Sequence, residues 1–107
     1  MKSESPLFCE MDVFTREQRE AHIRTTTQLV KAIQKLYEVE NGYEFVFPNG
    51  SPYITGIAEF IVNERLCCPF LEFELNVKPN EPSITLSLTG PAGTQEFLRA
   101  EFEEAFQ

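Results

Sequence analysis

Apolar and polar residues alternate in several short stretches of the chain, and a period of two along the sequence predicts β-strands. Clear alternation occurs over residues 43–47, 70–77 and 84–89, which are bounded by Gly, Pro or Asn. Residues 7–14 alternate as well, with Cys9 among the more apolar set. We therefore expect four strands, the first of them half-buried, with the Cys9 side chain facing inward.

A longer period, of about 3.6 residues, marks the first predicted helix. Thr15 followed by Gln18 is a capping box, which satisfies free backbone N–H groups at a helix start. The apolar stripe continues to about Glu40, where an Asn-Gly pair can adopt the left-handed conformation that ends helices. His22 lies near the centre of this stripe, so its side chain is predicted to face the core.

The second predicted helix begins at Ser51 and ends at the adjacent Cys67 and Cys68, because Pro69 disfavours helical conformation in the residue before it. Helical phase places Cys68 on the same face as three isoleucines and Cys67 off that face. We therefore predict that Cys67 is the more exposed of the two thiols. A third helix is predicted near the C-terminus, after a Gly-Pro-Ala-Gly turn.

These elements follow one another in the order β-α-β-α-β-β-α, and each presents one apolar face. The predicted fold class is α+β, with two layers, a four-stranded mixed sheet and helices on one face of it. A short turn forces the last two strands to pair antiparallel, whereas the longer crossovers permit either direction. A length of 107 residues is typical of one domain, and we take residues 1–107 as a single domain.

The chain is acidic, with 17 Asp and Glu against 9 Lys and Arg and a net charge of −8. This charge opposes binding to phosphate backbones and anionic lipids, so we expect neither a nucleic-acid partner nor a membrane partner. No apolar run approaches the ~20 residues that span a bilayer, and no signal-like run follows Lys2.

Three cysteines, two of them adjacent, form no regular disulfide set, which favours the cytoplasm. A patch on the last helix could be covered by another chain, so a protein partner or a homodimer is a further hypothesis.

Four residues are candidate metal ligands: Cys9, His22, Cys67 and Cys68. Thiolates select thiophilic ions, and three cysteines with one histidine are a permitted zinc set, so a thiophilic metal or metalloid is one hypothesis. The alternative is a non-catalytic interaction or regulatory domain whose cysteines only pack in the core, and redox chemistry is a third reading. No catalytic residue set is visible, and no other cofactor is indicated. The cysteine pair ends a helix, where the helix dipole should raise a thiol pKa.

Three segments carry distinctive motifs. They are Gly42–Phe45 (GYxF), Glu64–Leu75 (ERxCCPFLxFxL) and Leu88–Gly93 (LTGPxG). Together they resemble a set of small uncharacterised bacterial proteins, and the resemblance covers about residues 7–98. Similar segments also occur in extensions of metal-responsive regulators. The resemblance implies a bacterial cytoplasmic protein and directs attention to the cysteine pair, without giving it a role.

Overall fold

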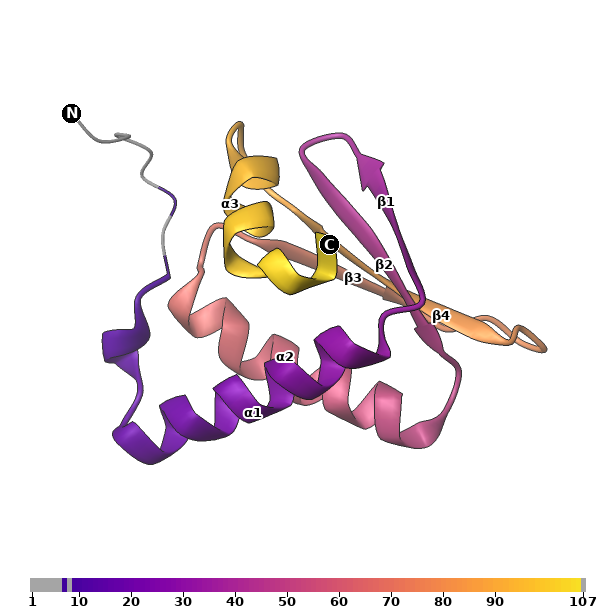
Figure 1. Cartoon of the computed structure of the whole chain (residues 1–107), viewed down its shortest axis with the longest axis horizontal. Coiled ribbons are helices and arrows are strands. Elements are labelled where there is room, and N and C mark those ends of the chain that lie inside the picture. Colours follow the sequence, from indigo (N-terminus) through magenta and orange to yellow (C-terminus); the bar gives the residue numbers. More distant parts are fainter. Residues whose placement is uncertain (1–6, 8, 107) are drawn as a thin grey trace.

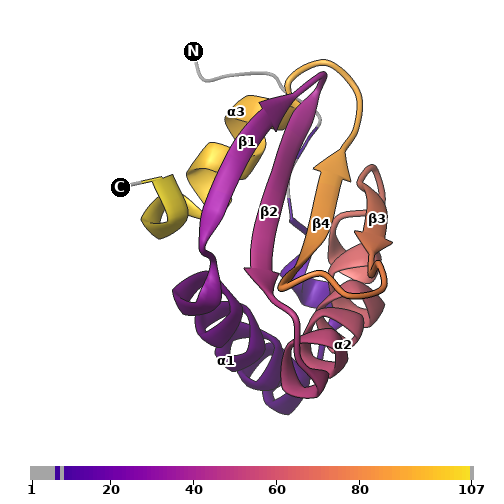
Figure 2. The same cartoon turned by 90° about the vertical axis from the view of Figure 1, so that its right-hand side faces the viewer.

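The computed structural model describes residues 7 and 9–106, so the residues that bear on a leader sequence lie outside it. Within this range, three helices cover one face of a four-stranded sheet (Figure 1, Figure 2). The helices are α1 (Arg16–Ala32), α2 (Ser51–Cys67) and α3 (Thr94–Glu101), and two short 3-10 turns are η1 (Met11–Val13) and η2 (Glu103–Phe106). The strands are β1 (Lys35–Val39), β2 (Gly42–Pro48), β3 (Glu72–Asn76) and β4 (Ser83–Thr89). The α+β class, with two layers and four strands, is confirmed.

The described sheet has the strand order β1-β2-β4-β3, and all of its pairs are antiparallel. The prediction of a mixed sheet is therefore wrong. β1 and β2 form a hairpin through only two residues, Glu40 and Asn41, and so short a connection permits only antiparallel pairing. β3 and β4 form the second hairpin, as predicted.

Helix α1 begins as predicted, because the Thr15 hydroxyl accepts from the Gln18 N–H and the Gln18 side chain accepts from the Thr15 N–H. It ends at Ala32, earlier than predicted, since residues 35–39 form the edge strand β1. Apolar residues of a short strand can also fall at helical spacing, and pairing with β2 decides between the two structures. Asn41, expected to end a helix, instead takes the left-handed conformation (φ 59°) in the β1–β2 turn.

The described part of residues 7–14 forms no strand, so the prediction made for this stretch is wrong. It is an irregular segment that contains the turn η1. Its backbone is tied to α2 instead of to the sheet, since the Glu10 N–H donates to the Cys67 carbonyl at 2.7 Å. Phe14 and Met11 anchor the segment, which lies against α2, and Cys9 still faces the core, whereas Val13 is exposed.

Helix α2 starts at Ser51 as predicted, and Ile57 and Cys68 are buried as expected from their shared face. The buried side is wider than predicted, because Phe60, Glu64 and Cys67 are buried as well. The helix packs against α1 and η1, and the Phe60 ring also lies 6.4 Å from that of Phe73 on β3, so its buried side includes the edge that periodicity alone had placed off the inward face. The buried hydrophobic side chains of the two central strands are those of Tyr43, Phe45, Phe47, Ile84, Leu86 and Leu88.

Candidate metal centre

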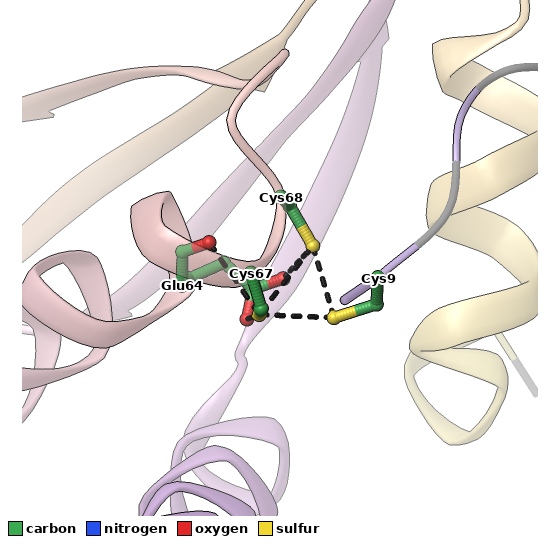
Figure 3. Close-up of side chains that lie close together, drawn as sticks. All are labelled: Cys9, Glu64, Cys67 and Cys68. Atoms are coloured by element: carbon green, nitrogen blue, oxygen red, sulfur yellow. Dashed lines mark hydrogen bonds between the residues drawn. The ribbon is translucent and has the colours of Figure 1, made fainter. Parts of the chain in front are cut away.

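Cys67 and Cys68 stand at the C-terminal end of α2, and Glu64 lies on the same side one turn earlier (Figure 3). Cys68 is the C-cap residue, with φ −128° and ψ 71°, so it departs from the helical phase of Cys67. This departure brings two adjacent thiols to one side, whereas a continuous helix would separate them by about 100°. Cys9 reaches both thiols from the N-terminal segment, which the hydrogen bond from Glu10 holds in place.

The three thiol sulfurs lie in contact with one another. Cys9 Sγ is 2.9 Å from Cys67 Sγ and 3.1 Å from Cys68 Sγ, and the sulfurs of the adjacent pair are 3.7 Å apart. All three cysteines are free; Cys67 and Cys68 are 0% exposed, and Cys9 is half-buried. Cys9 and Cys68, each assigned to an apolar face in the sequence, are thus brought into contact. The expected greater exposure of Cys67 is wrong, because α2 turns its edge toward the core.

A buried carboxylate completes the group. Glu64 is 1% exposed; its Oε2 lies 3.3 Å from Cys68 Sγ and its Oε1 3.8 Å from Cys67 Sγ. The donor atoms of Cys9, Glu64, Cys67 and Cys68 all lie within 4.8 Å of one another, and we call these residues the cysteine–glutamate cluster. Glu64 had no predicted role, although its spacing of three and four residues from the cysteines places it on their side of a helix.

His22 lies beside this cluster, on α1. Its Nε2 is 2.7 Å from Glu64 Oε1, and the rings of Phe14 and Phe60 flank it at 5.6 and 5.7 Å between ring centroids. The predicted inward position of His22 is confirmed, since it is buried. Burial acts to lower the pKa of His22, but hydrogen bonds with Cys67 and Glu64 outweigh it and raise the pKa to about 9. A protonated His22 thus offsets negative charge in the cluster and orients the Glu64 carboxylate.

Glu101, the last residue of α3, brings a second carboxyl group to the site. Its Oε2 lies 3.7 Å from Cys9 Sγ, and its Oε1 is buried without a hydrogen-bond partner among the described residues. Burial and the nearby Glu64 raise the pKa of Glu101 to about 9. The sequence offered no signal for this residue, because α3 is remote from both cysteine segments along the chain.

The three thiols differ in acidity because they share hydrogen bonds. Hydrogen bonds with Cys68 and Cys9 lower the pKa of the Cys67 thiol far below its usual range, although burial acts to raise it. The hydrogen bond with Cys67 in turn raises the pKa of Cys68 and that of Cys9. Cys67 is therefore the first of the three to carry negative charge. The rise in pKa expected for the cysteine pair therefore holds for Cys68 and not for Cys67, and contacts with neighbouring side chains are the main cause of both shifts.

The chain matches no protein-family model, no curated protein and no solved structure. Among the described residues, no helix combines the length and the apolar character that crossing a bilayer requires. What the cluster can bind therefore follows from its donor atoms and their surroundings. Three soft sulfurs and a carboxylate that converge in the interior are a donor set that could hold a metal ion.

Proposed function

We propose that this chain binds a thiophilic metal ion or metalloid through the sulfurs of Cys9, Cys67 and Cys68. The observation that carries the proposal is the convergence of three free thiols from segments 58 positions apart, at 2.9–3.7 Å from one another. Packing a small apolar side chain would explain each cysteine separately. It does not explain why all three sulfurs meet beside a buried carboxylate.

The spacing of the sulfurs supports coordination of one ion. In a tetrahedral zinc site with Zn–S bonds of about 2.3 Å, the sulfurs are about 3.8 Å apart. Sulfurs that now lie 2.9–3.7 Å apart would need to separate by less than about 1 Å. Cys9 can supply this movement because it belongs to an irregular segment and not to a helix or strand.

Glu64 is the fourth group of the proposed site, and His22 is its supporting partner. A buried carboxylate costs free energy unless it is paired, and His22 pairs with Glu64 at 2.7 Å. Pairs of this kind orient metal ligands and tune their basicity in known metal sites. His22 was also a predicted ligand, and it would fill the fourth position if its ring displaced the carboxylate it now contacts.

Titration with Cd²⁺ tests the proposal, since cadmium–thiolate bonds absorb in the ultraviolet. Reduced, metal-stripped wild type should form a 1:1 complex, and Cys9→Ser or Cys68→Ser should weaken it by about 100-fold or more, because a multidentate site gains 10²–10⁴ from joint binding. Met11→Leu is the matched control, since it removes a sulfur only 3.7 Å from Cys9 Sγ but outside the cluster. Equal affinity of wild type and both cysteine variants would contradict the proposal.

The second candidate function is a non-catalytic interaction domain. Its specific support is that Cys67 and Cys68 belong to the same buried apolar cluster as the core phenylalanines. In that case the cysteine variants would lose stability without any loss of metal binding, because the wild type would bind none.

The same contacts support a reducing compartment such as the cytoplasm. Three free thiols within 3.7 Å of one another would form disulfides readily under oxidising conditions. A cluster that binds an ion through all three sulfurs needs each of them reduced.

A further inference from the structure

We propose that the ion taken by this site is a trivalent metalloid, arsenic(III) or antimony(III), bound by the sulfurs of Cys9, Cys67 and Cys68. This inference rests on the proposed function and names the class of ion. Three features support it: the number of sulfurs, the occupied fourth direction and the charge of the surroundings.

The cluster offers three sulfurs in a compact triangle. Trivalent arsenic and antimony form three covalent bonds to sulfur and keep a lone pair, so their complexes are pyramids. The apex angles of such a pyramid are narrower than tetrahedral angles, and its sulfurs therefore lie closer together. The triangle here, with sides of 2.9, 3.1 and 3.7 Å, is smaller than the spacing of about 3.8 Å in a tetrahedral zinc site.

The fourth direction of the site is occupied by a carboxylate that already has partners. Glu64 Oε1 is held by His22 at 2.7 Å, and its Oε2 lies 3.3 Å from Cys68 Sγ. Zinc in a structural site needs four ligands, so Glu64 Oε2 would have to change from a contact of Cys68 Sγ into a ligand of the ion. A trivalent metalloid needs no fourth ligand, and the Glu64–His22 pair can stay as it is.

The charge of the surroundings also favours a neutral complex. Glu101 Oε2 lies 3.7 Å from Cys9 Sγ and Glu64 Oε2 lies 3.3 Å from Cys68 Sγ, so two carboxyl groups already border the sulfurs, and Glu64 is paired with His22 at 2.7 Å. Three thiolates around a divalent ion form a complex of charge −1, whereas three thiolates around a trivalent ion form a neutral one. Adding net charge to a buried site costs free energy, so the neutral complex is the better fit.

The binding reaction is balanced without any oxidant or reductant. Arsenous acid, As(OH)₃, exchanges its three As–O bonds for three As–S bonds, and each thiol proton leaves with a hydroxide as water. Arsenic stays trivalent and the sulfurs are not oxidised. Three thiols therefore release no net proton, and where Cys67 is already a thiolate the freed hydroxide takes up one proton from the solvent. A divalent cation that displaces thiol protons releases them instead.

The test compares sodium arsenite with Zn²⁺ on the reduced full chain. Arsenite should give a 1:1 adduct in native mass spectrometry and remove all three thiols from titration by a thiol reagent. Calorimetry in two buffers of different ionisation enthalpy should show no net proton release for arsenite and release for Zn²⁺. In competition, arsenite should displace Zn²⁺.

Single variants locate the bonds. Cys9→Ser, Cys67→Ser and Cys68→Ser should each weaken arsenite binding by about 100-fold or more, because each removes one of three joint bonds. Phenylarsine oxide, which forms only two As–S bonds, should still bind at least one of these variants with near wild-type affinity. Met11→Leu should bind arsenite like wild type, and circular dichroism of every variant separates loss of binding from loss of folding.

Two results have different meanings. If Zn²⁺ or Cd²⁺ binds through the cysteines but arsenite leaves a thiol free or fails to displace Zn²⁺, the metalloid inference is overturned and the proposed function stands. If none of these ions binds more tightly to wild type than to the folded cysteine variants, the proposed function fails as well.

Discussion

Among the three thiols of the cluster, Cys9 alone has exposed surface, while Cys67 and Cys68 lie beneath it. Alkylation needs a thiolate and also access for the reagent. Cys67 is the most acidic of the three, but the acidity of a fully buried sulfur does not help a reagent that cannot reach it. Access and acidity therefore point to different residues, and access limits the reaction.

We expect iodoacetamide to label Cys9 first in the native reduced protein. Cys67 and Cys68 should be labelled only when the structure opens locally, because both are 0% exposed. Their labelling rate should be lower than that of Cys9 by about tenfold or more. Peptide mass spectrometry over a time course measures the order, and the protein unfolded in denaturant provides the control, in which all three label together. Faster labelling of Cys67 would show that the N-terminal segment does not cover the cluster.

His22 should remain protonated through neutral pH in the metal-free protein. Its pKa of about 9 lies above the ordinary 6.5, so protons bind the folded state more tightly than the unfolded chain. The stabilisation is therefore complete below about pH 6.5 and is lost as the pH rises through 9. NMR titration of the imidazole measures the pKa, and the free energy of unfolding of wild type minus that of His22→Gln should fall over this pH window. A midpoint near 6.5 would contradict the pairing with Glu64.

At the scale of elements, the pairing of β2 with β4 depends on a close backbone approach at Gly42. Gly42 begins β2 opposite Val39 on one side and Thr89 on the other. A Cβ at this position would collide with the Leu88 carbonyl oxygen and lie 2.8 Å from Thr89 Cα. Both obstacles are backbone, which cannot move aside without breaking the ladder between β2 and β4.

Gly42→Ala should therefore lower the free energy of unfolding by about 1–3 kcal/mol, the usual cost of overpacking. Gly56→Ala is the matched control. Gly56 lies inside helix α2, and a Cβ there would meet only the Leu29 side chain, at 3.5 Å. Alanine is a better helix former than glycine, so the control should be neutral or more stable by up to about 1 kcal/mol. Denaturant unfolding of both variants decides, and equal stabilities would contradict the close approach of β2 to β4.

At the scale of the whole molecule, we expect the core to form without a bound ion. Among the residues that the structure describes, fifteen apolar residues form the buried cluster, and thirteen of them are not cysteines. We expect a strong chelator to leave the far-UV circular dichroism unchanged, unlike in small zinc domains that unfold without metal. Collapse of the spectrum would show instead that an ion is part of the folded structure.

A bound ion should nevertheless stabilise the folded state by mass action. An ion at 100 times its Kd adds about 2.7 kcal/mol, which corresponds to roughly 10 °C or more in Tm for a domain of this size. Thermal unfolding with and without Cd²⁺ measures the shift, and Cys9→Ser should abolish it. A shift that persists in Cys9→Ser would place the ion elsewhere on the protein.

The sequence by itself determined the elements whose pattern is local. The capping box at Thr15, the start of α2 at Ser51 and the strands β2 and β4 were all predicted, because periodicity and capping depend on residues only a few positions apart. The inward position of His22 also followed from the apolar side of its helix, whereas Cys9 faces the core although the strand predicted for it is absent.

The tertiary structure alone decided which neighbour covers each face. Residues 35–39 became a strand because β2 offers them a partner, although their spacing also suits a helix. Cys67 became buried because α2 packs on two neighbours, and Glu64 joined the thiols because His22, 42 positions away, pairs with its charge. A local sequence pattern predicts that a side chain is buried. The residues that bury it come from a distant part of the chain, and the pattern does not identify them. The cluster is built from such contacts, so its fourth group could be recognised only in the folded protein.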